Sequence, residues 1–182
     1  MSILTKLMTR ITLLILLALN SFNVFSQESC YDIENITNGS FAGGSTAGWK
    51  LGTGWVYGTQ AIGVANTTSP ATNLILSQTM ANPLTTQTYK LTFWAGVHDF
   101  NSSNRSRTAT LEVKIGGVTY AKFTNNTGNS NNVTLEHFNG ATSDFTSYST
   151  TTGWLGSKNV NFEIPINAAS ASNNDIEFIY NS

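Results

Sequence analysis

Cysteine is almost absent from this chain. Only Cys30 is present among 182 residues, so no intramolecular disulfide can hold the fold together, and burial of apolar side chains has to do so. Charged residues are also scarce, at 10% of the chain, and the formal net charge is −1. Such a chain offers no basic surface to nucleic acid, and we expect no nucleic-acid partner.

The N-terminal residues have the three-part pattern of a secretory signal peptide. Lys6 and Arg10 precede an apolar run over Ile11–Leu19. Val24 and Ser26 are small or medium-sized residues at the −3 and −1 positions of a cleavage site before Gln27, which predicts a signal peptide at 1–26. The apolar run is shorter than a membrane span requires, so a retained anchor is the weaker alternative. We expect a secreted, extracellular or cell-surface protein with no membrane contact after cleavage.

Cys30 lies just after the predicted cleavage site. The residues before it, Gln27–Ser29, differ from the apolar and small residues that precede a lipidated bacterial cysteine. We therefore interpret Cys30 as a free thiol near the mature N-terminus, with lipidation as the weaker alternative.

Residues 27–182 are enough for a single domain with a hydrophobic core. Thr, Ser, Asn and Gly are abundant, and apolar residues recur at period two, which predicts an all-β sandwich or barrel without helices longer than a turn or two. The strongest predicted strands are Asn73–Thr79, Thr88–Gly96, Thr108–Ile115, Val118–Phe123, Asn159–Ile166 and Asp175–Tyr180. Weaker ones are Asp32–Ile36, Trp55–Tyr57, Gln60–Ala65, Val133–His137 and Phe145–Tyr148, and surface loops are expected at 98–107 and 125–132.

Two adjacent glycines, Gly116–Gly117, predict a tight hairpin turn. Simple two-residue register then pairs Val113 with Tyr120 and carries Lys122 inward and Phe123 outward. Because an unpaired buried lysine is strongly unfavourable, we expect a β-bulge or a strand end near Lys122.

The strand predicted over Thr88–Gly96 places a large aromatic residue, Trp94, on its polar face. The side chains expected on the same side are those of Lys90, Thr92 and His98. A sugar presents apolar C–H faces to an aromatic ring and hydroxyl groups to polar side chains around it. We predict a ligand-binding surface here; the alternative, held equal, is that a neighbouring loop covers the ring.

The other three tryptophans are candidates either for core packing or for ligand binding. Trp49 is expected in the core, and Trp55 and Tyr57 share one face, either core or binding. Trp154 lies in a loop-like region and is a candidate ligand-binding residue, with cover of a sandwich end as the equal alternative.

Catalytic motifs are missing from the sequence. The acids Asp99, Glu112, Glu136 and Asp144 have no motif around them and are interpreted as solvated surface residues. His98 and His137 lack the spacing of a zinc site, and no nucleophile elbow, Walker loop or glycine fingerprint occurs. We expect a protein that is not an enzyme and that holds no metal at a catalytic site.

Several motifs, in this order, resemble the carbohydrate-binding-module-like jelly rolls of the galactose-binding-like superfamily found in secreted bacterial proteins. The opening motifs are "ITNGSF" (Ile36–Phe41) and "AGWKLGTGW" (Ala47–Trp55). The later ones are "LSQT" (Leu76–Thr79), "YKLTFWA" (Tyr89–Ala95), "LEVKIGG" (Leu111–Gly117), "FEIPI" (Phe162–Ile166) and "DIEFIY" (Asp175–Tyr180). The resemblance covers nearly the whole mature chain and implies an antiparallel jelly roll.

The sequence departs from that family in two places. Family members usually have an acidic residue after the opening turn, often near a structural calcium, whereas Ala42 follows Phe41 here. The expectation of a bound calcium is therefore weakened, and no other cofactor is expected. The family also continues into a final strand after one like Asp175–Tyr180, whereas this sequence ends at Ser182. We expect one of two explanations. Either the last strand is missing because the sequence is part of a longer protein with further domains, or the sandwich of this protein is completed in a different way.

Two classes of function follow from the resemblance. The first is a non-catalytic carbohydrate-binding module of a secreted protein whose partner is a polysaccharide or a cell-surface glycan. The second is a structural or adhesive β-sandwich domain with no sugar site. The fold alone does not choose between them, because this superfamily contains both.

Overall fold

The computed structural model describes residues 35–39, 41, 45–57, 62–64, 70–97, 108–125, 132–149 and 158–182. These residues belong to one compact unit, Glu34–Ser182. The predicted signal peptide, Cys30, the predicted loop 98–107 and the interior of the loop 125–132 lie outside the described residues. Within the described ranges, no helix is both long enough and apolar enough to span a membrane.

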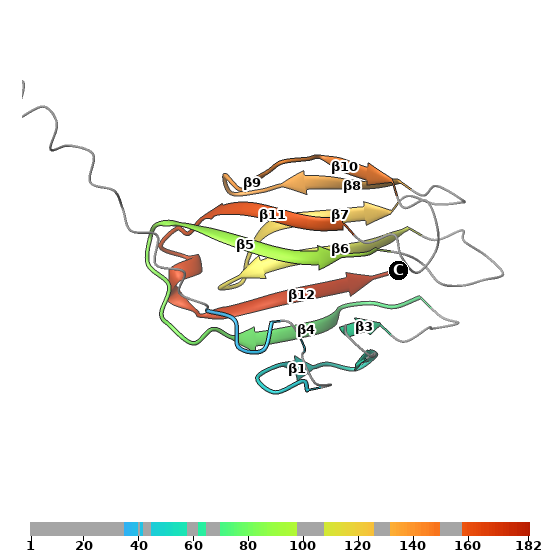
Figure 1. Ribbon diagram of the computed structural model, residues 1–182, viewed down its shortest axis with the longest axis horizontal. Coiled ribbons are helices and arrows are strands. Elements are labelled where there is room, and N and C mark those ends of the chain that lie inside the picture. The colour runs from blue at the N-terminus through green and yellow to red at the C-terminus, as the bar shows by residue number, and fades with distance from the viewer. Residues whose placement is uncertain are drawn as a thin grey trace, which may run out of the picture. The chain divides into compact units, whose positions relative to one another are not determined.

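The fold is an all-β antiparallel sandwich, as the sequence predicts, and Figure 1 shows its two main sheets as facing layers. The seven-stranded sheet has the order β1 (Lys50–Leu51), β4 (Leu74–Thr79), β12 (Asp175–Asn181), β6 (Ala109–Ile115), β7 (Val118–Asn125), β8 (Asn132–His137) and β10 (Ser147–Ser149). The three-stranded sheet has the order β5 (Thr88–Ala95), β11 (Lys158–Pro165) and β9 (Thr142–Ser143). A separate two-stranded sheet joins β2 (Trp55–Tyr57) and β3 (Ile62–Val64).

All six of the strongest predicted strands occur, with ends that differ by one or two residues. Two very short strands, β1 and β9, were not predicted, and Phe145 lies before β10 rather than in it. The described residues Asn35 and Ile36 are not in a strand. Both main sheets are open, so the jelly-roll topology itself stays a prediction.

Aromatic residues join the two main sheets. The ring of Phe93 on β5 lies 5.2 Å from that of Phe178 on β12 and 6.0 Å from that of Phe123 on β7. Phe162 on β11 stacks on Phe93, with ring centroids 5.9 Å apart. These four rings fill the space between the layers, and Phe123 and Phe162 are almost completely buried.

The hairpin of β6 and β7 contains the irregularity that the sequence predicts. Its register shifts between Val113 and Lys114, so Val113 pairs with Ala121; the predicted pairing of Val113 with Tyr120 is wrong. Tyr120 is the extra residue of the bulge, and the strand beyond it is turned over. As a result, Phe123 points into the core, and Lys122 faces outward opposite Glu112.

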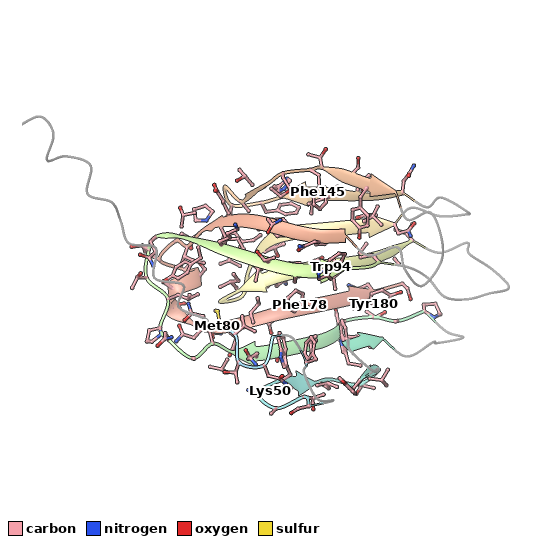
Figure 2. The ribbon with its side chains drawn as sticks, viewed as in Figure 1. Lys50, Met80, Trp94, Phe145, Phe178 and Tyr180 are labelled. Atoms are coloured by element: carbon pink, nitrogen blue, oxygen red, sulfur yellow. The ribbon has the colours of Figure 1, made fainter. Side chains whose placement is uncertain are left out.

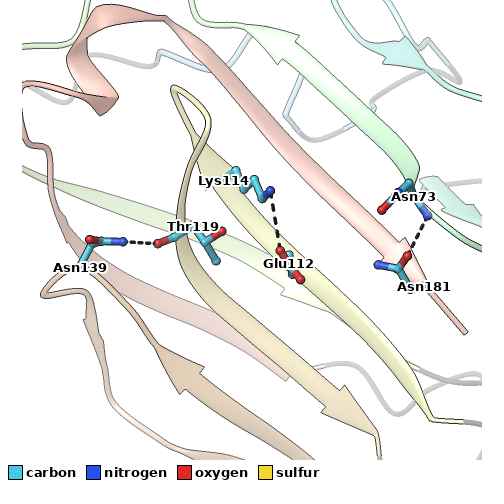
Figure 3. Close-up of polar contacts among 6 residues, drawn as sticks. All are labelled: Asn73, Glu112, Lys114, Thr119, Asn139 and Asn181. Carbon is cyan, nitrogen blue, oxygen red and sulfur yellow. Dashed lines mark hydrogen bonds and ion pairs between the residues drawn. The ribbon is translucent and has the colours of Figure 1, made fainter.

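Contacts with a distant turn explain the position of the bulge. The hydroxyl of buried Tyr120 donates to the carbonyl oxygen of Pro165 at 3.1 Å and lies 2.7 Å from Oγ of Ser170. Ser170 begins a short 3₁₀ turn, Ser170–Ser172. On the next hairpin, Asn139 donates from Nδ2 to the carbonyl oxygen of Thr119 at 2.8 Å (Figure 3). The tip of the β6–β7 hairpin is therefore held from both sides.

A buried glutamine attaches the first described loop to the sandwich. Nε2 of Gln78 on β4 donates to the carbonyl oxygen of Thr37, and the Thr37 N–H donates to Oε1 of Gln78, both at 2.8 Å. Trp49 packs beside this loop, with its ring centroid 5.5 Å from that of Phe41 and 6.1 Å from that of Phe178. The predicted core position of Trp49 agrees with this packing against the core.

The two turn glycines allow a matched test of this packing. Both have positive φ, 58° at Gly116 and 80° at Gly117, but a Cβ at Gly116 would overlap the carbonyl oxygen of Ser170, whereas one at Gly117 meets open space. We expect Gly117→Ala to cost about 1 kcal/mol of unfolding free energy and Gly116→Ala about 3 kcal/mol. Urea denaturation measures both, and equal costs would contradict the close approach to Ser170.

Candidate functional site

Trp94 is the most exposed large apolar side chain among the described residues. It is 70% exposed, and it lies on the outer face of β5 at the margin of the three-stranded sheet (Figure 2). The other exposed large apolar residues are smaller or more covered: Val56 at 47%, Ile75 at 37% and Phe138 at 37%. The ring of Trp94 is therefore largely uncovered by the described residues, and the loop 98–107 that the alternative reading invokes lies outside them.

The pairing of β5 with β11 determines which residues surround this ring. The two strands pair along all eight residues, and Val160, Phe162 and Ile164 of β11 are buried in the core. Because side chains alternate along a strand, the residues between them point outward. Asn159 lies opposite Trp94, and Asn161 lies opposite Thr92.

We call the outer surface of β5 and β11 the Trp94 face. Around Trp94 it has five polar residues: Lys90 and Thr92 on β5, and Asn159, Asn161 and Glu163 on β11. Thr92 Oγ1 donates to Asn161 Oδ1 at 3.0 Å. Lys90 and Glu163 lie opposite each other in the next outward row and are both exposed. Oδ1 of Asn159 is buried without a hydrogen-bond partner in the described part of the chain, although the residue as a whole is partly exposed.

The predicted site residues are only partly described. Lys90, Thr92 and Trp94 lie together on the Trp94 face, as the alternation predicts. His98 and Trp154 lie outside the described residues.

Sequence reasoning missed the contribution of β11. The alternation within "NVNFEIPI" is enough to place Asn159, Asn161 and Glu163 outward. It does not reveal that β11 is the partner of β5, which is what brings these residues beside Trp94.

The outer face of the seven-stranded sheet has a different character. Lys122 on β7 lies between Glu112 and Glu136 on its two neighbouring strands. Lys114 lies opposite Glu177, and its Nζ is 3.9 Å from Oε2 of Glu112 (Figure 3). Charges of opposite sign thus alternate across this sheet, and no large aromatic interrupts them in its described strands.

Three other aromatic residues of the described chain, Trp55, Tyr57 and Tyr148, are partly buried. Trp55 and Tyr57 are half-buried, with Trp55 against the core, while Val56 between them points to solvent. Tyr148 donates from its hydroxyl to the carbonyl oxygen of Ala95 at 3.0 Å. Burial raises the pKa of Tyr148 above its ordinary value, so this phenol stays neutral in its packing role.

Among the described residues, a contact between His137 and Ser143 resembles a catalytic pair, and its hydrogen bonds indicate a structural role. Nε2 of His137 lies 2.9 Å from Oγ of Ser143, but that hydroxyl donates to the carbonyl oxygen of Phe145 at 2.6 Å. The imidazole therefore donates to Ser143 and is not placed to remove its proton. No group of three or more potential metal ligands occurs within the described ranges.

Comparison of the chain with protein-family models, with curated proteins and with solved structures finds no match. The function therefore has to be derived from the chemistry of the Trp94 face.

Two adjacent aromatics of β5 provide a matched pair for testing the outward position of Trp94. Phe93→Ala removes a ring from the cluster between the sheets, and we expect it to cost about 3 kcal/mol of unfolding free energy. Trp94→Ala removes a solvent-exposed ring and should change the unfolding free energy by no more than about 0.5 kcal/mol. Chemical denaturation of both variants gives the comparison; a large cost for Trp94→Ala would place that ring in the fold's packing.

Proposed function

We propose that this protein is a non-catalytic carbohydrate-binding domain that binds a polysaccharide or a cell-surface glycan outside the cell through its Trp94 face. The observation that carries the proposal is a tryptophan 70% exposed on the outer face of a sheet, next to polar side chains from two strands. The secretory pattern of the first 26 residues supports an extracellular ligand.

The chemistry of the face suits a sugar better than other small ligands. An indole ring offers its flat apolar surface to the C–H face of a sugar ring, and this contact buries both from water. Nδ2 of Asn161 can donate to a sugar at the edge of that contact, and Oγ1 of Thr92, whose proton goes to Asn161 Oδ1, can accept from one. A sheet surface with one exposed ring and several short polar groups matches a ligand that has apolar faces and many hydroxyls.

The resemblance to carbohydrate-binding-module-like jelly rolls points to the same class of ligand. It rests on the ordered motifs from Ile36–Phe41 to Asp175–Tyr180. The sugar-binding members of this superfamily bind glycans without transforming them, which fits a proposal of binding without catalysis.

The direct test is retardation of the purified protein in native gels that contain polysaccharides. We expect at least one glycan to retard the wild type, and Trp94→Ala to weaken that binding by about 1–2 kcal/mol, or roughly tenfold, because one stacking aromatic is lost. Phe138→Ala, which removes another exposed aromatic from a different part of the surface, is the matched control and should bind as the wild type does.

Retardation of the wild type by no glycan, or identical mobility of wild type and Trp94→Ala on every glycan, would overturn the proposal. Either result would favour a structural or adhesive sandwich domain, the second class that the sequence allows.

A further inference from the structure

We infer that the Trp94 face binds an elongated, uncharged glycan that lies along β5, with Lys90 and Glu163 forming a second contact point. This inference rests on the proposed function and specifies its ligand. It follows from the narrowness of the small sheet and from two opposite charges, Lys90 and Glu163, that form no ion pair with each other.

The small sheet is narrow beside Trp94. β9 pairs with β11 only at Phe162 and Glu163, so the row that contains Trp94 and Asn159 is two strands wide in the described chain. A ligand stacked on Trp94 and extending across the strands would leave the described sheet after Asn159. A ligand that extends along the strands stays on it.

Along the strands, the face continues through further polar rows. The row of Thr92 and Asn161 is followed by the row of Lys90 and Glu163, where Thr142 of β9 adds a third strand. At about 3.4 Å per residue, the four steps along the strand from Trp94 to Lys90 span roughly 14 Å. This length suits an oligosaccharide rather than a single sugar.

Lys90 and Glu163 are cross-strand neighbours of opposite charge, yet the described structure has no ion pair between them. On the other sheet, by contrast, Lys114 and Glu112 approach to 3.9 Å. An ammonium group and a carboxylate that are both exposed and unpaired can contact the same sugar, since a hydroxyl accepts from the first and donates to the second.

The same two charges argue for an uncharged ligand. They cancel each other, so the second contact point has no net charge with which to hold a polyanion. Binding of a neutral glycan should also be insensitive to salt, because no charge on the ligand is screened.

Calorimetric titration with oligosaccharides of increasing length, prepared from a neutral polysaccharide that retards the protein, tests the inference. We expect affinity for the wild type to rise with length until the ligand reaches Lys90 and Glu163. Glu163→Gln and Lys90→Ala should each lose about tenfold for long oligosaccharides and little for a disaccharide, because only long ligands reach these residues. Lys114→Ala, a surface lysine of the other sheet, is the control and should match the wild type at every length.

Polygalacturonate, a polyanion, and a series of salt concentrations complete the test. Affinity that does not grow with length, unchanged binding in both Glu163→Gln and Lys90→Ala, or preferred and salt-sensitive binding of polygalacturonate would overturn the inference. In each case, loss of binding in Trp94→Ala would leave the proposed function standing. If no glycan binds the wild type at all, the proposed function fails and this inference fails with it.

Discussion

The packing of four phenylalanines between the sheets is the constraint on which the rest of the structure depends. Phe93 on β5 and Phe162 on β11 meet Phe123 of the large sheet, and Phe93 also meets Phe178. Since side chains alternate strictly, a slip of one residue along β5 would exchange its two faces: Phe93 would turn to water and Trp94 to the core. The core therefore determines the outward position of Trp94, although Trp94 adds little to the core itself.

The same rule explains how much of the site the sequence predicts. Alternation within one strand is a local property, so the common face of Lys90, Thr92 and Trp94 follows from the residues alone. Strand pairing is not local. β11 lies far along the chain from β5, and only the folded sheet shows that Asn159 and Asn161 stand beside Trp94 and Thr92. One strand of the site was predictable, and its partner was not.

The β6–β7 hairpin shows a different limit. The residue types reveal a conflict, because uninterrupted alternation would bury Lys122 and expose Phe123. They do not reveal where the conflict is resolved. The extra residue of the bulge is Tyr120, because its hydroxyl forms hydrogen bonds with Pro165 and Ser170, which are 45 and 50 residues away in the chain. The two-residue strands β1 and β9 escaped prediction for a related reason: each is defined by its partner strand and not by a pattern of its own.

The two outer faces of the sandwich use their charges differently, and this contrast separates a solvated surface from a candidate binding surface. On the large sheet, Lys122 lies between Glu112 and Glu136, so the charge of this lysine has partners of opposite sign within the protein. On the small sheet, an open tryptophan lies on a strand at the sheet's margin, a combination that favours association with other molecules. Lys90 on the same strand counters unwanted strand pairing by placing a charge near this margin. An exposed ring beside such a charge and short polar side chains contributes little to packing. The proposed ligand, apolar on one face and rich in hydroxyls at its edge, would give that ring a role.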